Sequence, residues 1–419
     1  MFETAQKKER VILAGVSLAD GDDAEKSLDE LEDLADTAGA VCVGRILQKR
    51  EGLHPATYLG KGKIRELKDL IWETEADGVI CDDELSPAQI GNLRDELDVK
   101  IMDRTLLILD IFAARASTSE GKIQVELAQL KYRQSRLTGF GTSLSRLGGG
   151  IGTRGPGEKK LEMDRRLIKG RISQLARELK EVKRHRQLTR ESRAKSRIPV
   201  AAIVGYTNAG KSTLLNRLTD AGILAEDKLF ATLDPTTRSM RLPGGQEVLL
   251  TDTVGFIRKL PHHLIEAFRS TLEEAAYADL LLHVVDASSP QMDEQMHVVY
   301  ETLGELGAAD KPVITVFNKK DRFEGDYMPR DFRAERTVFL SAATGEGMEQ
   351  LPVCLEEILR QQKKEIERLC PYSDAWMVQL IRKYGELEQE EYRQDGIYVR
   401  GYVPAAVYGK IMGGPPGGR

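Results

Sequence analysis

The most informative segment for the fold is IPVAAIVGYTNAGKSTLLNRL, residues 198–218. An apolar run of strand length, Ile198–Val204, leads into the turn GYTNAGKST, residues 205–213, and an apolar helical pattern follows. The turn fits the template G-x-x-x-x-G-K-[ST], whose glycines let backbone amides converge on phosphate oxygens. The order strand, turn, helix therefore predicts a phosphate-binding loop in a doubly wound α/β domain.

Each residue type in this loop has a physical reason to be there. Gly205 and Gly210 permit backbone angles that other residues avoid, and the helix N-terminus attracts anions. We expect Lys211 to contact the β- and γ-phosphates and the Ser212 hydroxyl to ligate Mg²⁺. The whole turn is predicted to contact the nucleotide: Gly205, Tyr206, Thr207, Asn208, Ala209, Gly210, Lys211, Ser212 and Thr213.

Two later segments complete the expected phosphate and metal site. LLTDTVGF places Asp252 at the end of a strand, where its carboxylate can hold Mg²⁺ through water, and Gly255 where its amide can meet the γ-phosphate. Between loop and strand lies FATLDPTTR, residues 230–238, which is expected to supply a threonine hydroxyl to Mg²⁺. Our first choice is Thr237 and the second is Thr236.

The base is predicted to be guanine, so the expected substrate is GTP. Asn318-Lys319-Lys320-Asp321 follows the strand-like run VITVF. The carboxylate of Asp321 can accept hydrogen bonds from both guanine N1–H and N2–H, a donor pair that adenine lacks. Ser341-Ala342-Ala343 follows another strand, where a backbone amide can reach guanine O6.

The position after Asp252-Thr253-Val254-Gly255 carries Phe256, where many GTPases have a glutamine that orients the attacking water. We therefore expect either slow hydrolysis or catalytic help from elsewhere. The loop resembles that of potassium-stimulated GTPases, in which an asparagine at the position of Asn208 helps to hold a monovalent cation. A purely loop-shaping role for Asn208 is an equal alternative. The residues predicted to act in catalysis are Lys211, Thr237, Gly255 and Asn208.

The rest of the chain divides into further segments. We predict an α/β multidomain protein with an N-terminal α/β domain over 1–105, a helical hairpin over 106–197, a GTPase domain over 198–367 and a small α/β domain over 368–419. Residues 104–135 are expected to form one helix. In the second helix Ile168, Ile172, Leu175, Leu179 and Val182 recur with coiled-coil spacing. The basic, glycine-rich segment 139–158 would form the tip, and a solvated helical linker is the alternative.

Charge is distributed very unevenly along the chain, although the total is only −5. By count, residues 1–121 carry 15 Lys+Arg and 26 Asp+Glu, residues 122–197 carry 21 and 7, and residues 198–419 carry 25 and 33. The corresponding net charges are −11, +14 and −8. The basic block predicts contact with RNA phosphates. Its cations include Arg146, Arg154, Lys159, Lys160, Arg165, Arg166, Lys183, Arg184 and Arg186.

Several other classes of protein are not expected. The four cysteines form no CxxC pair, which argues against a disulfide framework or a zinc site. No apolar run approaches the ~20 residues of a membrane span, and the N-terminus lacks the pattern of a signal peptide. We expect a cytoplasmic protein, with peripheral membrane association as an open possibility, and a monomer.

The layout resembles HflX-type GTPases, a ribosome-associated family related to translation factors. The resemblance covers nearly the whole chain and is most specific in FATLDPTTR, in DTVGFIRKLPHHLIEAFRSTLEE, and in three upstream segments. These are HPATYLGKGKIREL (54–67), ARASTSEGKIQVELAQLKYR (114–133) and RLGGGIGTRGPGEKKLEMDRR (146–166). The resemblance implies binding to the large ribosomal subunit and its RNA through the basic hairpin 122–197, and separation of stalled or hibernating ribosomes.

Three alternatives remain open from the sequence. A ribosome assembly GTPase acting on immature large subunits would share all the GTPase motifs. A signalling switch with protein partners would share them too, although the basic hairpin argues against it. The family has also been associated with ATP outside the GTPase domain, and Gly60-Lys61-Gly62-Lys63 is a candidate second nucleotide site, with a turn that opens a helix as the simpler interpretation.

Overall fold

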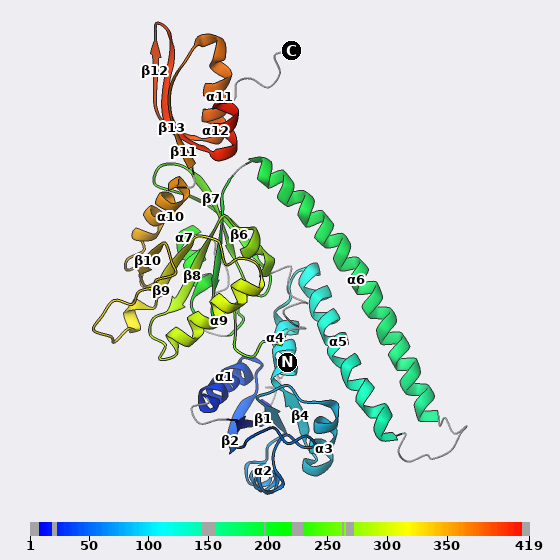
Figure 1. The fold of residues 1–419 in the computed structure, drawn as a ribbon. Helices are drawn as coiled ribbons and strands as arrows, with labels where there is room; N and C mark the ends of the chain where they lie inside the picture. Colours follow the sequence, from blue (N-terminus) through cyan, green and yellow to red (C-terminus); the bar gives the residue numbers. More distant parts are fainter. Residues whose placement is uncertain are drawn as a thin grey trace, which may run out of the picture. The chain divides into compact units, whose positions relative to one another are not determined.

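A computed structural model describes residues 8–18, 23–144, 156–196, 198–219, 229–261, 264, 272–361 and 363–412 (Figure 1). The chain forms two compact units. The first contains residues 1–187, 224–235 and 254–273, and the second contains residues 188–223, 236–253 and 274–419. Two short segments that flank the pair of strands over 236–252 thus belong to the same unit as the N-terminal residues. No helix in the described part of the chain is long and apolar enough to cross a membrane.

The first unit begins with a small parallel sheet. Its strands are β1 (Arg10–Ser17), β2 (Val41–Lys49), β3 (Gly78–Cys81) and β4 (Lys100–Asp103), in the order β2-β1-β3-β4. Helices α1 (Ala24–Thr37), α2 (Lys61–Thr74) and α3 (Pro87–Leu97) connect them. Strands β1 and β3 are almost wholly buried, as expected where helices cover both faces of a parallel sheet. The predicted α/β class is confirmed here.

The expected continuous helix over 104–135 is wrong, because the chain forms two helices. These are α4 (Arg104–Arg115) and α5 (Ser119–Leu144). Ala116 adopts an extended conformation with φ −64° and ψ 108°, which ends α4. Ser117 and Thr118 then donate hydrogen bonds to Asp234, a residue more than 110 positions further along the chain. A long-range contact stabilises this break, so local helix-forming tendency alone did not reveal it.

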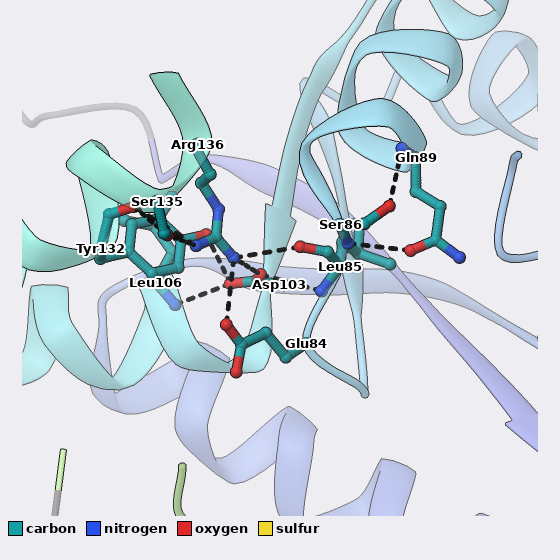
Figure 2. Close-up of polar contacts among 9 residues, drawn as sticks. All are labelled: Glu84, Leu85, Ser86, Gln89, Asp103, Leu106, Tyr132, Ser135 and Arg136. Atoms are coloured by element: carbon teal, nitrogen blue, oxygen red, sulfur yellow. Dashed lines mark hydrogen bonds and ion pairs between the residues drawn. The ribbon is translucent and has the colours of Figure 1, made fainter. Parts of the chain in front are cut away.

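Helix α5 is fixed to the N-terminal sheet by a buried polar cluster around Asp103 (Figure 2). Asp103 ends β4 and accepts hydrogen bonds from Tyr132 Oη at 2.8 Å and from the Arg136 guanidinium at 2.6 Å. It also accepts from the amides of Leu85 and Leu106, at 3.1 and 2.9 Å. Figure 2 shows the Arg136 guanidinium lying over the Tyr132 ring, with its carbon 3.2 Å from the ring centroid. This cluster holds the first helix of the predicted hairpin against the sheet.

The basic segment forms two antiparallel helices, α5 and the 41-residue α6 (Pro156–Ser196). Leu127 packs against Leu175 and Leu179, two positions of the predicted apolar seam. Arg171 bonds to Glu126 at 2.7 Å, and Arg165 donates to the Leu137 carbonyl at 2.7 Å. Figure 1 shows α5 and α6 side by side over this region. Most of the glycine-rich tip, including Arg146 and Arg154, lies outside the described residues.

The second unit contains a six-stranded sheet with strand order β10-β9-β8-β5-β7-β6. The strands are β5 (Val200–Gly205), β6 (Thr236–Arg241), β7 (Glu247–Asp252), β8 (Leu280–Asp286), β9 (Val313–Asn318) and β10 (Arg336–Phe339). All neighbouring pairs are parallel except β6 with β7. Helices α7 (Lys211–Thr219), α9 (Met292–Glu305) and α10 (Gln350–Gln361) accompany the sheet. This is the doubly wound fold that the opening stretch predicted.

The C-terminal part forms a separate apolar core in the second unit. Strands β11 (Lys363–Cys370), β12 (Glu386–Arg393) and β13 (Gly396–Pro404) make an antiparallel sheet that packs with α11 (Ala375–Tyr384) and α12 (Ala405–Met412). The turn at Gln394-Asp395 joins β12 to β13. Strand β11 begins at Lys363, five residues before the domain boundary that we expected at 368. The final GGPPGGR lies outside the described residues.

Candidate functional site

The phosphate loop lies at the carboxyl end of β5, and close packing explains both of its glycines. Gly205 has φ +151°, and a Cβ there would lie 2.2 Å from the Val284 carbonyl oxygen. Gly210 has φ +93°, and its Cβ would lie 2.3 Å from Asn318 Nδ2. Both positions combine a conformation unfavourable to other residues with a neighbour that leaves no room. The backbone of the loop is therefore free to approach a ligand closely, as the motif predicts.

Lys211 begins α7 and is buried. Its Nζ donates to the Tyr206 carbonyl at 2.7 Å. Burial lowers the pKa of Lys211 to about 8, although the Asp252 carboxylate opposes this shift. The phosphate groups of a bound nucleotide would place negative charge beside the buried ammonium, so they would raise the pKa of Lys211 again. This position suits a cation that binds a polyanionic ligand.

The two oxygen donors predicted for Mg²⁺ are in contact. Ser212 Oγ donates to Asp252 Oδ2 at 2.7 Å, joining the start of α7 to the end of β7. A hydroxyl and a carboxylate are the hard oxygen ligands that Mg²⁺ prefers. The donor set therefore fits the metal. The described residues contain no group of three or more His, Cys, Asp or Glu side chains that could hold another metal ion.

Thr237 does not join this pair. It lies opposite Thr251 in the β6–β7 ladder, and the two hydroxyl oxygens are 3.0 Å apart. Thr236 lies opposite Asp252, and directly opposed residues of an antiparallel pair share one face of the sheet. Of our two candidates, the structure therefore places the second choice on the face of Asp252. The physical reason is the strand register, which the sequence of FATLDPTTR did not disclose.

Two further loop residues have distinct environments. Thr207 Oγ1 is buried and has no hydrogen-bond partner within the described parts of the chain, so it is available to a phosphate oxygen. Asn208 has φ +60°, a left-handed conformation that asparagine tolerates better than most residues. The backbone thus gives Asn208 a structural role whether or not its amide binds a cation. Ala209 contributes its carbonyl, which accepts a hydrogen bond from Asn318 Nδ2 at 2.8 Å.

The segment predicted to recognise guanine is tied to the phosphate loop through Asn318. Besides the bond to Ala209, Asn318 Oδ1 accepts from the Ala342 amide at 2.9 Å. Ser341 Oγ donates to Asp321 Oδ1 at 2.5 Å, and this bond lowers the pKa of Asp321. Asp321 is therefore ionised at neutral pH, as acceptance from two guanine N–H groups requires. Ala343 follows in the same loop, with its carbonyl 3.4 Å from Arg217 Nη2.

One residue of this region was missed by the sequence analysis. Asp286 ends β8, and its Oδ2 lies 2.8 Å from Lys319 Nζ. Its other oxygen accepts from Ser288 Oγ at 2.6 Å. Lys319 has the left-handed φ of +62°, so this ion pair orients a strained residue of the Asn318–Asp321 motif. The only signal in the sequence was an aspartate at the end of an apolar run, LLLHVVD.

The first unit contains segments from either side of β6 and β7. Asp234, from FATLDPTTR, accepts hydrogen bonds from the amides of Ser117 and Thr118 at 2.9 and 2.8 Å, and from their hydroxyls at 2.7 and 2.5 Å. These bonds outweigh the effect of burial and lower the pKa of Asp234. The Phe230 ring meets the Phe112 ring edge-on, with centroids 4.7 Å apart. The segment is thus held at the junction of α4 and α5.

The segment after Asp252 is held in the same unit. Lys259 Nζ is bonded to Asp82 and lies 3.0 Å from Asp83 Oδ1, and these carboxylates raise the pKa of Lys259 despite its burial. Asp82 also pairs with buried Arg104 at 2.9 Å. Phe256 is only 1 % exposed, so its ring belongs to a core and is not offered to water. Gly255 precedes it, three residues beyond Asp252.

Sequence profiles of three protein families cover most of the chain. They are described as GTP-binding GTPase N-terminal, matching residues 25–113, GTP-binding GTPase Middle Region, matching 115–193, and 50S ribosome-binding GTPase, matching 200–319. Among solved structures, a GTP-binding protein from Sulfolobus solfataricus in complex with GDP is 26 % identical, with a TM-score of 0.45. The similarity covers 84 % of this chain and 99 % of that one.

Curated relatives match over nearly the full length. GTPase HflX of Lacrimispora saccharolytica is 65 % identical over 411 residues, which are 98 % of this chain and 97 % of the relative. GTPase HflX of Escherichia coli is 42 % identical over 400 residues, covering 94 % and 93 %. These matches agree with the phosphate loop and the doubly wound sheet described above. The chain therefore belongs to the HflX family of GTPases and hydrolyses GTP.

Proposed function

We propose that this GTPase binds the large ribosomal subunit and separates the subunits of stalled or hibernating ribosomes. GTP binding drives association, and hydrolysis resets the protein. The observation that carries the proposal is the composition of the first unit. It combines the basic helix α5 and α6 up to Gln187 with the two segments that flank β6 and β7. A ligand of the helices therefore acts on the unit that contains these two segments, residues 224–235 and 254–273.

The charge of α6 supports RNA as the ligand of these helices. Arg166, Lys169, Arg171, Arg177, Lys180 and Arg184 are all exposed. Two of them pair with glutamates on α5 or α6, and the segment 122–197 still carries a net +14. Such a segment exchanges counterions for RNA phosphates. Arg165 is used inside the hairpin instead, and the side chains of Lys159, Lys160, Lys183 and Arg186 lie outside the described residues.

The contacts of Asp234 and Lys259 suggest how binding is communicated. Both residues come from segments that must rearrange around the γ-phosphate in a GTPase cycle. In the structure they are bonded to the start of α5 and to the end of β3. We infer that GTP favours one arrangement of these contacts and that the ribosome-bound form favours the same one. Separation of the subunits then follows because the bound protein excludes the other subunit.

Sedimentation of intact ribosomes with the protein and GTP, GDP or a non-hydrolysable analogue tests the proposal. Free subunits appearing with GTP and with the analogue would support it. Binding restricted to immature large subunits would instead support the alternative, a ribosome assembly GTPase. Replacement of Lys169, Arg177 and Lys180 by alanine should weaken ribosome binding in a salt-dependent manner. Unchanged binding in that variant would contradict the assignment of α6.

Mg²⁺ is proposed to be held by Ser212, by Asp252 through water, and by one threonine of β6. When bound, the ion neutralises charge that develops on the phosphates. The chain itself contributes the Lys211 ammonium, the loop amides and the Gly255 amide. The register predicts that Thr236→Ala reduces Mg²⁺-dependent turnover more than Thr237→Ala does. The reverse order would restore Thr237, our first choice, as the ligand and as a catalytic residue.

Potassium is proposed as the source of catalytic help that Phe256 cannot provide. Asn208→Gly is the informative variant, because glycine keeps the left-handed backbone while the amide is removed. If Asn208 holds K⁺, this variant binds GTP normally but loses the difference in rate between K⁺ and Na⁺. Equal rates of GTP hydrolysis by the wild type in K⁺ and in Na⁺ would contradict the cation proposal. A second source of help is the ribosome itself.

Other expectations remain proposals. ATP binding near Gly60–Lys63 is one, and the structure shows that the Gly60 amide already donates to Gln48 Oε1 at 2.8 Å. Titration with labelled ATP would test it, in a variant of this protein that no longer binds nucleotide at the phosphate loop. We also propose that the protein is cytoplasmic and monomeric. Sedimentation of the pure protein would check the monomeric state. Peripheral association with membrane is the remaining possibility for localisation.

A further inference from the structure

Helix α2 separates its charges into stripes. Lys61, Arg65, Lys68 and Trp72 follow one another at steps of four, three and four residues, so they lie within about 60° of arc. Glu66, Asp69 and Glu73 form an adjacent acidic stripe. Ile64 and Leu67 face the core of the N-terminal sheet. We call the first set the α2 stripe.

All four side chains of the α2 stripe are exposed, and Trp72 is 84 % exposed. In the described parts of the chain, Lys61, Arg65 and Lys68 form no ion pair, whereas nearby Lys63 pairs with Glu66 at 2.8 Å. The stripe is unusual in its surroundings, because residues 1–121 carry a net charge of −11. Tryptophan is mostly buried on average, so an indole this exposed beside three unpaired cations is an uncommon surface feature.

We propose that the α2 stripe is a second RNA-binding surface, in which Lys61, Arg65 and Lys68 contact successive phosphates and an unpaired base stacks on Trp72. Cations that recur every ~5 Å along a helix suit a phosphate backbone, and aromatic side chains stack on unpaired bases. Insertion into a membrane is disfavoured because Ile64 and Leu67, the apolar face of α2, are already buried in the core.

The surface is independent of the hairpin that carries the proposed function, although both would contact RNA. The chain has only two tryptophans, and the other, Trp376, packs in the C-terminal core. The full-length variant Trp376→Phe therefore reports on Trp72 alone. We expect a single-stranded oligoribonucleotide to quench its fluorescence, as stacking on a base requires. The triple variant Lys61→Ala/Arg65→Ala/Lys68→Ala should lower affinity about tenfold and reduce the salt slope by about two, since each phosphate contact on a single strand contributes about 0.7.

The matched control changes the acidic stripe of the same helix. Glu66→Gln/Asp69→Asn/Glu73→Gln should leave RNA affinity equal or slightly higher, and both triple variants should retain the wild-type Tm. Absence of Trp72 quenching by RNA would overturn the proposal. Quenching of Trp72 fluorescence by poly-glutamate but not by RNA would also overturn it. A blue shift of Trp72 emission seen only with anionic phosphatidylserine vesicles would overturn it as well. Loss of ribosome binding in the α6 variant with Trp72 quenching by RNA retained would support the α2 stripe as an RNA-binding surface separate from α6.

Discussion

The parallel strands of the two sheets have opposite chemistry at their carboxyl ends. In the second unit, β5 ends in a glycine-rich loop whose backbone is open to an anion, and Lys211 lies at its end. In the first unit, β3 is followed by Asp82 and Asp83 and β4 ends in Asp103, and all three carboxylates already bind cations or hydroxyls of the protein. Ligands of doubly wound sheets bind at this edge. One edge therefore suits a nucleotide, whereas the other binds the protein's own Arg104, Arg136 and Lys259.

The comparison shows that, in two sheets of the same fold class, a few residues decide what the carboxyl edge binds. Glycines that exclude side chains create an anion site, while carboxylates at the equivalent edge bind cations and hydroxyls from helices and from the segment after Asp252. We infer that the N-terminal edge is a docking point for parts of the same chain. Four substitutions test this contrast.

Asp103→Ala removes the buried carboxylate at the N-terminal edge. It leaves the Arg136 guanidinium, Tyr132 Oη and the Leu85 amide without their common acceptor. Breaking a buried ion pair in this way costs about 3–5 kcal/mol of unfolding free energy. Chemical denaturation should show this loss, and Asp103→Asn should lose less because it keeps one acceptor oxygen. A loss below 1 kcal/mol for the alanine variant would show that α5 is anchored elsewhere.

His283 lies on β8 of the second unit and is buried and neutral. Burial lowers its pKa to about 4, below the usual value of 6.5. A depressed histidine pKa leaves stability constant above pH 6.5 and reduces it as the pH falls from 6.5 towards 4, because the unfolded chain binds the proton first. The loss is about 3 kcal/mol at most. Between pH 7 and 4 the Tm should therefore fall more steeply with decreasing pH for wild type than for His283→Gln. Parallel plots of Tm against pH would contradict this.

Gly210→Ala tests the open backbone of the phosphate loop. The added Cβ would lie 2.3 Å from Asn318 Nδ2, so the loop or the guanine segment must shift. We expect GTP affinity to fall about 100-fold, as a misplacement near 1 Å can produce. Gly245→Ala is the matched control, since Gly245 also has a positive φ, +86°, but has open space around its Cβ. Equal affinities of the two variants would show that crowding at Gly210 is unimportant.

Asp234→Ala removes the four hydrogen bonds at the start of α5. Loss of such a capping carboxylate costs about 1 kcal/mol locally. Hydrogen exchange at Ser117 and Thr118 should then accelerate roughly fivefold, while amides of β1 keep their wild-type rates. An unchanged exchange rate at Ser117 would mean that Asp234 does not hold this junction.

Much of the nucleotide site could be predicted because its motifs are local. The turn over 205–213, Asp252 and Asn318–Asp321 each follow an apolar strand directly, so a parallel sheet brings them to one edge. The position of Thr236 opposite Asp252 could not be foreseen, because the β6–β7 register depends on strand pairing. Asp286 was missed because its partner, Lys319, is 33 residues away. The helix break at Ala116 was missed for the same reason, since it is stabilised by Asp234.

The amino-acid sequence alone was enough to predict a phosphate loop, a guanine motif and a basic segment between two acidic ones. Local order and residue type carry that information, because backbone conformation and charge depend on near neighbours. Only the tertiary structure decided which residues pair across long distances. It placed Asp234 at the start of α5 and Lys259 against Asp82, and it left the Trp72 side chain exposed, because long-range pairing and burial arise only when the chain is packed.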